Sequence, residues 1–213
     1  MIDRISRRSL LGMGAALSAS LPICRPAWAS LAADGVAPEL VARARGALEL
    51  HKASLLHTDR IGIVDFARPS REPRFHLLDA VNGRATDYLV AHGRGSDPTH
   101  TGWVTRLSNE PRSYASSEGA YVTRELYVGA HGRSMRLAGL DAVNSNAEVR
   151  ALVIHAAWYV SPQIARETGK VGRSEGCFAV SADSLDEVIG QLGPGRLIYA
   201  SGIDSRVRQS LRG

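Results

Sequence analysis

The sequence predicts a mainly β domain, a sandwich or barrel with a few helices. Short segments rich in β-branched and aromatic residues recur from residue 61 to residue 200. Turn residues separate these segments, and Asn82-Gly83 is a strong hairpin signal between two of them. A chain of 213 residues is long enough for one domain with a hydrophobic core of its own.

The elements follow from local patterning. An apolar stripe with Pro38 in its first turn predicts a helix before the main domain, and an amphipathic segment with acidic residues near its start predicts a second helix. The polar, turn-rich segment 93–119 is too long for a simple connection, so we expect it to shape a cleft. The predicted strands are 61–66, 75–81, 86–91, 121–128, 134–140, 151–154 and 196–200, and the predicted helices are 37–57 and 181–192.

The first 29 residues have the pattern of a signal peptide. A basic start containing Arg7-Arg8 precedes an apolar stretch over residues 10–23, and Ala27-Trp28-Ala29 is a cleavage signal. The arginine pair followed by two leucines resembles a twin-arginine signal, and an ordinary secretory leader is the alternative. The apolar stretch is too short for a comfortable membrane span. We therefore expect the export machinery to deliver the protein to the periplasm or cell envelope, with no stable membrane insertion.

Charge and cysteine content narrow the range of possible functions. Four arginines and one aspartate in residues 1–29 account for three of the five net positive charges, so the mature chain is only weakly basic and nucleic acid is not an expected partner. Removal of the leader also removes Cys24. Cys177 is then a single thiol in an oxidising compartment, with no partner for an internal disulfide. Such a thiol is either buried as a packing residue or used for a chemical function.

A histidine and a cysteine 22 residues apart carry the chemistry. His155 ends a predicted strand, and the 22 residues to Cys177 suffice for the chain to leave that strand and return beside it. An imidazole next to a thiol can take its proton and create a thiolate nucleophile. Gly176 permits a tight turn that could aim the amides of Gly176 and Cys177 at a developing oxyanion. One cysteine, one histidine and one glycine are by themselves a weak signal.

The segment around Cys177 resembles the YkuD-type murein L,D-transpeptidase catalytic domain family, in the branch with Gly-Arg-Ser-x-Gly-Cys. Shared stretches extend over about residues 60–200, nearly all of the mature domain. The resemblance implies a division into a signal peptide (1–29), a helical lead-in (30–58), a YkuD-like catalytic domain (59–203) and a C-terminal tail (204–213). Besides the cysteine motif and His155, the stretches include 63–66, 91–96, 108–109, 116–121 and 136–140.

The family implies a two-step acyl transfer on peptidoglycan stem peptides. Cys177 would attack the donor carbonyl after the L-centre of meso-diaminopimelate, with His155 as general base and then acid. The carbonyl of Ala156 would orient His155, and the amides of Gly176 and Cys177 would bind the oxyanion. Among candidate substrate-binding residues, Ser174 could also serve only within its turn, and Arg173 could equally be a surface cation. His92, with His131, could line the cleft.

Several points stay open from the sequence. The broad family often has histidine where this chain has Glu175, and arginine or asparagine where it has Ala179, which leaves the contacts to the substrate carboxylate undefined. We expect Glu175 to point away from the thiol or to bind an acceptor amine. No cofactor is implied, and the spacing of His92, His131 and His155 matches no compact metal motif. An L,D-carboxypeptidase or endopeptidase using the same pair, and a non-catalytic wall-binding protein, are the alternative functions.

Overall fold

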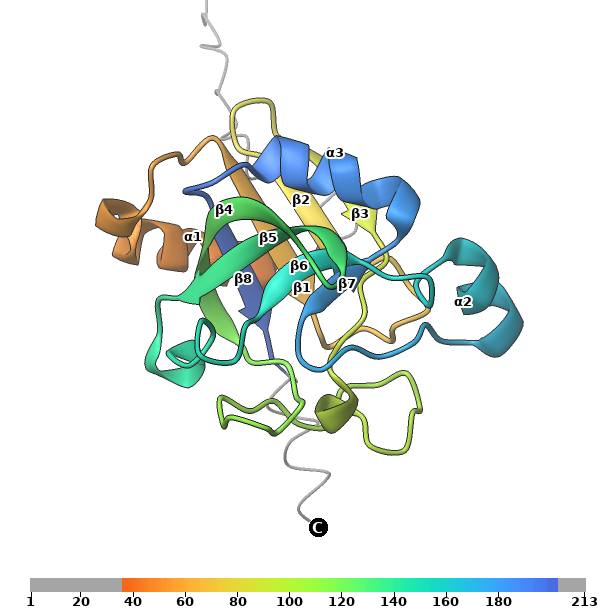
Figure 1. Cartoon of the computed structure of the whole chain (residues 1–213). Helices are drawn as coiled ribbons and strands as arrows, with labels where there is room; N and C mark the ends of the chain where they lie inside the picture. The colour runs from red at the N-terminus through yellow and green to blue at the C-terminus, as the bar shows by residue number, and fades with distance from the viewer. Residues whose placement is uncertain (1–35, 203–213) are drawn as a thin grey trace, which may run out of the picture.

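The computed structural model describes residues 36–202, in which eight strands form one mixed sheet (Figure 1). Their order across the sheet is β3-β2-β1-β8-β4-β5-β6-β7. The mainly β prediction is therefore confirmed. The strands are β1 Arg60–Asp65, β2 Phe75–Asp79, β3 Arg84–Tyr88, β4 Gly119–Gly129, β5 Gly132–Gly139, β6 Val153–Ala156, β7 Phe178–Val180 and β8 Leu197–Ser201; the α-helices are α1 Pro38–Leu50, α2 Pro162–Thr168 and α3 Ala182–Leu192.

Seven of the strands lie where local patterning predicts them. Both predicted hairpins are present, β2 with β3 around Asn82-Gly83 and β4 with β5 around His131-Gly132. The helix predicted over 37–57 ends at Leu50, because the chain enters a 3₁₀ turn at 52–54 and becomes extended at Leu55. The signal peptide at 1–29 and the tail at 204–213 lie outside the described residues.

β7 and α2 are not predicted from the sequence. β7 has only three residues, too few to show a period of two. α2 is short, but it carries recognisable boundaries: the Ser161 side chain accepts a hydrogen bond from the Ile164 amide, Pro162 follows, and Gly169 ends the helix at φ 73°. These two elements flank the segment that contains Cys177.

The ends of the sheet are joined by the chain that follows β3. Ala91 forms an antiparallel bridge with Ala179 of β7, and Gly93 forms a parallel bridge with Ser174. The amide of Ser174 donates to the carbonyl of His92 at 2.9 Å, and the Arg94 amide donates to the carbonyl of Ser174 at 2.8 Å. This pairing closes the sheet in the manner of a barrel, which leaves β7 without a free edge.

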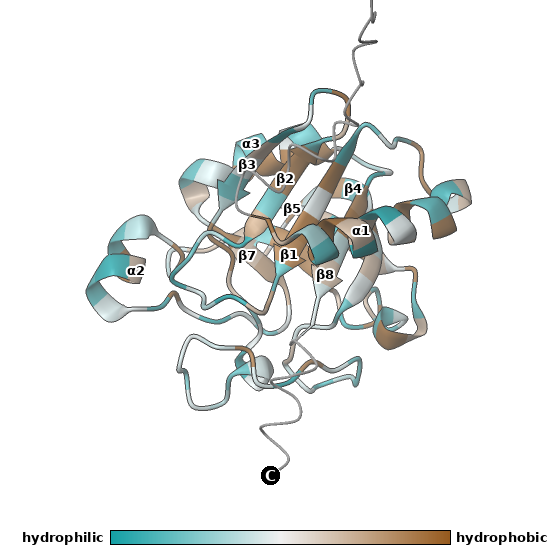
Figure 2. Ribbon diagram, turned by 180° about the vertical axis from the view of Figure 1, so that it is seen from behind, coloured by the Kyte–Doolittle hydropathy of each residue, from teal (hydrophilic) through white to brown (hydrophobic). Residues whose placement is uncertain are grey.

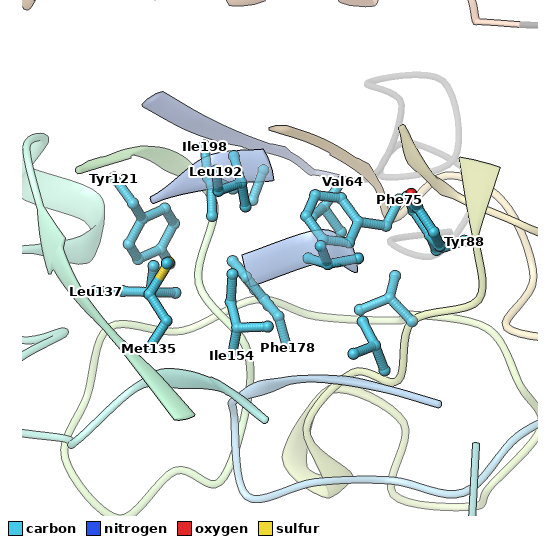
Figure 3. Close-up of a cluster of buried hydrophobic side chains, with 14 of the residues drawn as sticks. Val64, Phe75, Tyr88, Tyr121, Met135, Leu137, Ile154, Phe178, Leu192 and Ile198 are labelled. Atoms are coloured by element: carbon cyan, nitrogen blue, oxygen red, sulfur yellow. The ribbon is translucent and has the colours of Figure 1, made fainter. Parts of the chain in front are cut away.

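Two hydrophobic clusters hold the sheet between helices. One face packs on α3, which contributes Leu185, Val188, Ile189 and Leu192 to the main core (Figure 3). The other face, over β1 and β8, is covered by the apolar side of α1, as the reverse view shows (Figure 2). Phe178 of β7 lies in the main core, so the strand that follows Cys177 is anchored by burial.

A polar cluster is buried beside the closure of the sheet. The Arg74 guanidinium donates to the carbonyl of Val90 and lies 2.7 Å from His92 Nδ1. Because arginine only donates, Nδ1 accepts and the His92 proton sits on Nε2, 3.4 Å from Asp97 Oδ2. Burial and the Arg74 charge lower the pKa of His92 to about 3, so the imidazole is neutral.

The structure does not place His92 in the cleft, where the sequence had suggested it could lie. Its side chain is fully buried and does not line the cleft that contains Cys177. The reason is that the chain before Gly93 turns inward to pair with β7, which directs the imidazole to Arg74 rather than to the surface.

Replacement of Phe178 tests the anchoring of β7. The ring is 1% exposed and packs edge-on against Tyr121 with centroids 5.5 Å apart. We expect Phe178→Ala to lower the free energy of unfolding by about 3–5 kcal/mol, measured by urea denaturation, because it leaves a cavity in the core. Val81→Ala, at a side chain that is 72% exposed, is the control and should change it by less than about 0.5 kcal/mol.

The buried His92 predicts a loss of stability in acid. Its pKa is lowered in the folded protein, so the unfolded chain binds the proton more readily as the pH falls below about 6.5. The stabilisation contributed by neutral His92 is therefore present above pH 6.5 and is lost progressively toward pH 3. We expect His92→Gln to flatten the dependence of unfolding free energy on pH between 6.5 and 4. The exposed His57→Gln is the control, and equal slopes in wild type and His92→Gln would contradict the assignment.

Candidate functional site

The pairing of β6 with β7 brings His155 and Cys177 together. The two strands are parallel, and His155 lies opposite Ala179. Cys177 lies in the bend immediately before β7, two residues from the partner of His155. Because both side chains line one cavity, they lie at the same face of the molecule.

This face opens into a cavity of about 750 Å³. Residues from the polar segment 93–119 form one wall, which confirms that this segment shapes a cleft. Both His155 and Cys177 reach the cavity, as do Arg173 and Ser174. The complete lining is Pro111, Arg112, Tyr114, His131, Val149, Arg150, Ala151, His155, Tyr159, Arg173, Ser174, Glu175 and Cys177.

His155 is held in the tautomer suited to a general base. Its Nδ1 lies 2.9 Å from the carbonyl oxygen of Ala156, which can only accept, so Nδ1 carries the proton and Nε2 has a free lone pair. The ring stacks on His131 with centroids 4.3 Å apart. Burial is the main cause that lowers the pKa of His155, and His131 lowers it further. The imidazole is consequently neutral at pH 7.

Cys177 rests as a protonated thiol. It is 9% exposed, and its sulfur hydrogen-bonds to the carbonyl oxygen of Ala151, 3.7 Å away, rather than to His155. Burial raises the pKa of the thiol and Glu175 acts in the same direction, whereas a hydrogen bond from the Val153 backbone and the charge of Arg150 lower it. Ala151 has φ 51°, a left-handed conformation that a non-glycine residue adopts at a cost.

The turn before Cys177 is closed by Ser174. Its hydroxyl donates to the Cys177 carbonyl at 2.7 Å and accepts from the Gly176 amide at 3.1 Å. That amide is thus already used within the turn, and Gly176 serves here through its φ of 119°, which favours glycine. A Cβ atom on Gly93 would lie 2.8 Å from the Cα of Gly176, so glycine at 93 permits the close approach of the two segments.

The two charged residues of the motif, Arg173 and Glu175, both interact with other residues of the protein. Arg173 donates to the carbonyl oxygens of Asp97 and Pro98 while it lines the cavity. Glu175 forms an ion pair of 2.9 Å with Arg94, whose guanidinium stacks over Tyr114 at 4.0 Å. Glu175 therefore lines the cavity with its charge compensated by Arg94, a partner that the sequence analysis did not identify.

His131, Arg150 and Tyr159 complete the site and come from three separate segments. The His131-Gly132 turn indicated that His131 could line the cleft, but no spacing in the sequence relates Arg150 or Tyr159 to Cys177. Within residues 36–202, no three His, Cys, Asp or Glu side chains are grouped as metal ligands. The helices of the same range include none with the length and apolar character needed to cross a bilayer.

Comparison with solved structures finds several L,D-transpeptidases at low identity. The enzyme from Mycobacterium smegmatis is 12% identical with a TM-score of 0.41 over 68% of this chain and 59% of its own. That of Xylanimonas cellulosilytica is 13% identical with a TM-score of 0.40 over 74% and 68%. Bd1075 of Bdellovibrio bacteriovorus is 14% identical with a TM-score of 0.42 over 75% and 59%. This chain thus spans about 59% of the length of two of these three proteins.

The family assignment rests on the sequence match. No curated protein is significantly similar to this chain. The family model for the L,D-transpeptidase catalytic domain matches residues 33–201, which include His155, Cys177 and every residue that lines the cavity. The chain belongs to the L,D-transpeptidase catalytic domain family.

Proposed function

We propose that this protein is an exported peptidoglycan L,D-transpeptidase that works through a cysteine thioester. The observation that carries the proposal is that His155 of β6 and Cys177, the residue before the paired strand β7, line one cavity in a chain of this family. The leader at 1–29 would direct it to the periplasm or cell envelope, where stem peptides are its substrates. Residues 30–58 would be a lead-in to the catalytic domain at 59–203.

The first half-reaction is acylation of Cys177. His155 Nε2 takes the thiol proton, and the sulfur attacks the donor carbonyl carbon after the L-centre of meso-diaminopimelate. The carbon–nitrogen bond to terminal D-alanine then breaks, and the histidine returns the proton to the leaving amine. For this step the thiol exchanges its hydrogen bond to the Ala151 carbonyl for one to His155.

The second half-reaction releases the acyl group to an acceptor. An amine of another stem peptide attacks the thioester carbonyl, and its proton passes to His155. The carbon–sulfur bond then breaks, and His155 returns the proton to the sulfur, which regenerates the Cys177 thiol. The Ala156 carbonyl stabilises the protonated imidazole through its bond to Nδ1. Arg173 and Ser174, which line the cavity, are the proposed contacts to the donor peptide.

A carbapenem tests the nucleophile. We expect the mature protein to gain the mass of one carbapenem, measured by intact mass spectrometry, because the thiolate opens the lactam ring and stays acylated. Cys177→Ala should gain no mass, and His155→Gln should react more than tenfold more slowly because general-base catalysis contributes about 10²–10⁴. An adduct that forms equally on Cys177→Ala would refute the assignment of the nucleophile.

Purified sacculi test the reaction. Treatment with the mature protein followed by muramidase digestion and mass spectrometry should yield new cross-linked dimers, because an amine resolves the thioester. Cys177→Ala is the control and should leave the muropeptide profile unchanged. Shortened monomers without new dimers would show that the protein hydrolyses stem peptides and does not transfer them. An unchanged muropeptide profile with the wild-type protein would rule out both activities.

A further inference from the structure

Arg150 places a positive charge beside the cysteine. Its half-buried side chain lines the same cavity as His155 and Cys177. One Nη atom donates to the Ser108 carbonyl at 2.7 Å and to the Ser117 hydroxyl at 3.2 Å, and the other donates to the Ala115 carbonyl. The guanidinium is therefore fixed in place by the cleft segment 93–119.

The hydrogen bonds of Arg150 reach only neutral oxygen atoms. No Asp or Glu of residues 36–202 forms an ion pair with it, whereas Arg94, Arg133, Arg136 and Arg196 each have a carboxylate within 2.9 Å. A partly buried cation is costly unless an anion compensates it. The arrangement is therefore suited to an anion that forms inside the cavity.

The position of Arg150 identifies that anion. Its Nη2 lies 3.1 Å from the point that a Cβ atom on Gly176 would occupy, directly beside the turn that presents Cys177. The next residue, Ala151, accepts the hydrogen bond of the Cys177 thiol and holds a left-handed φ of 51°. Two adjacent residues thus bring a carbonyl to the sulfur and a guanidinium to the turn that presents it, the first suited to the thiol and the second to the thiolate.

Other charged groups also line the cavity around Cys177. Glu175 opposes a thiolate, but Arg94 compensates its charge at 2.9 Å. Arg173, like Arg150, donates to backbone carbonyls, but Arg150 is the arginine whose charge lowers the pKa of the Cys177 thiol. The titratable and charged groups that line the cavity with Cys177, besides Arg150, are Arg112, Tyr114, His131, His155, Tyr159, Arg173 and Glu175.

We propose that Arg150 is the electrostatic partner of the Cys177 thiolate and stabilises it against its burial in the cleft. The proposal rests on Cys177 being the nucleophile of the proposed function. Since Arg150 acts through the sulfur, it contributes to reactivity without contact to the reacting carbonyl. Its guanidinium and the Ala151 carbonyl together set the balance between a resting thiol and a reactive thiolate.

The test is the pH dependence of thiol alkylation without substrate. The mature chain has only Cys177, so the rate of iodoacetamide modification reports this thiol alone. We expect Arg150→Gln to raise the midpoint of the rate–pH curve by about 1 pH unit, with about a tenfold slower reaction at pH 7, because an opposite charge nearby favours the ionised form. Arg150→Lys retains the charge and should restore at least half of the shift. The exposed Arg84→Gln removes the same charge from β3 and should leave the midpoint unchanged.

Two outcomes would overturn the proposal. An unchanged midpoint of the rate–pH curve in Arg150→Gln would show that the charge of Arg150 does not affect the sulfur. Equal shifts in Arg150→Gln and Arg150→Lys would show that the effect comes from the hydrogen bonds of Arg150 to segment 93–119 and not from its charge. If Arg150→Gln does not fold, nitrogen NMR of labelled arginine in the wild type decides, because the Arg150 resonances should titrate with Cys177 and not in Cys177→Ala. If the protein shows no transpeptidase activity, the proposed function fails, but the alkylation rates still show whether Arg150 stabilises the Cys177 thiolate.

Discussion

The parallel pairing of β6 with β7 is the constraint on which the site depends. It sets His155 opposite Ala179 and so brings Cys177, in the bend two residues earlier, near the imidazole, where both side chains line one cavity. β7 has only three residues, and its stability comes from burial of Phe178 in the core and from the bridge of Ala179 to Ala91. The reactive pair is therefore positioned by packing and closure of the sheet rather than by a long strand.

The charges around the thiol describe a resting state that is held back from reaction. The sulfur is buried and bonded to the Ala151 carbonyl, and His155 is neutral with its free Nε2 lone pair toward the cleft. A protonated thiol is a poor nucleophile and resists oxidation, which would suit a single thiol in the proposed envelope location. In the proposed mechanism, conversion to the thiolate requires transfer of one proton to His155, and Arg150 would favour the product of that transfer.

The buried polar cluster of Arg74, His92 and Asp97, beside the closure of the sheet, links the stability of the fold to the site. Burial and the charge of Arg74 hold His92 in a neutral form, and the His92 carbonyl accepts the amide hydrogen of Ser174. Ser174 in turn closes the turn that carries Cys177. Acid that protonates His92 would thus act on the backbone next to the nucleophile, without any contact between the imidazole and a substrate.

Local patterning in the sequence determined most of the strands, both hairpins and the candidate pair His155 and Cys177, because alternation, turn residues and a motif are properties of neighbouring residues. Only the tertiary structure decided that Arg150 and His131 reach Cys177 and His155 and that His92 does not. The three share no spacing with the motif. Their places follow from sheet closure and from loops that meet across the cleft, contacts between segments far apart in the chain that no local pattern records.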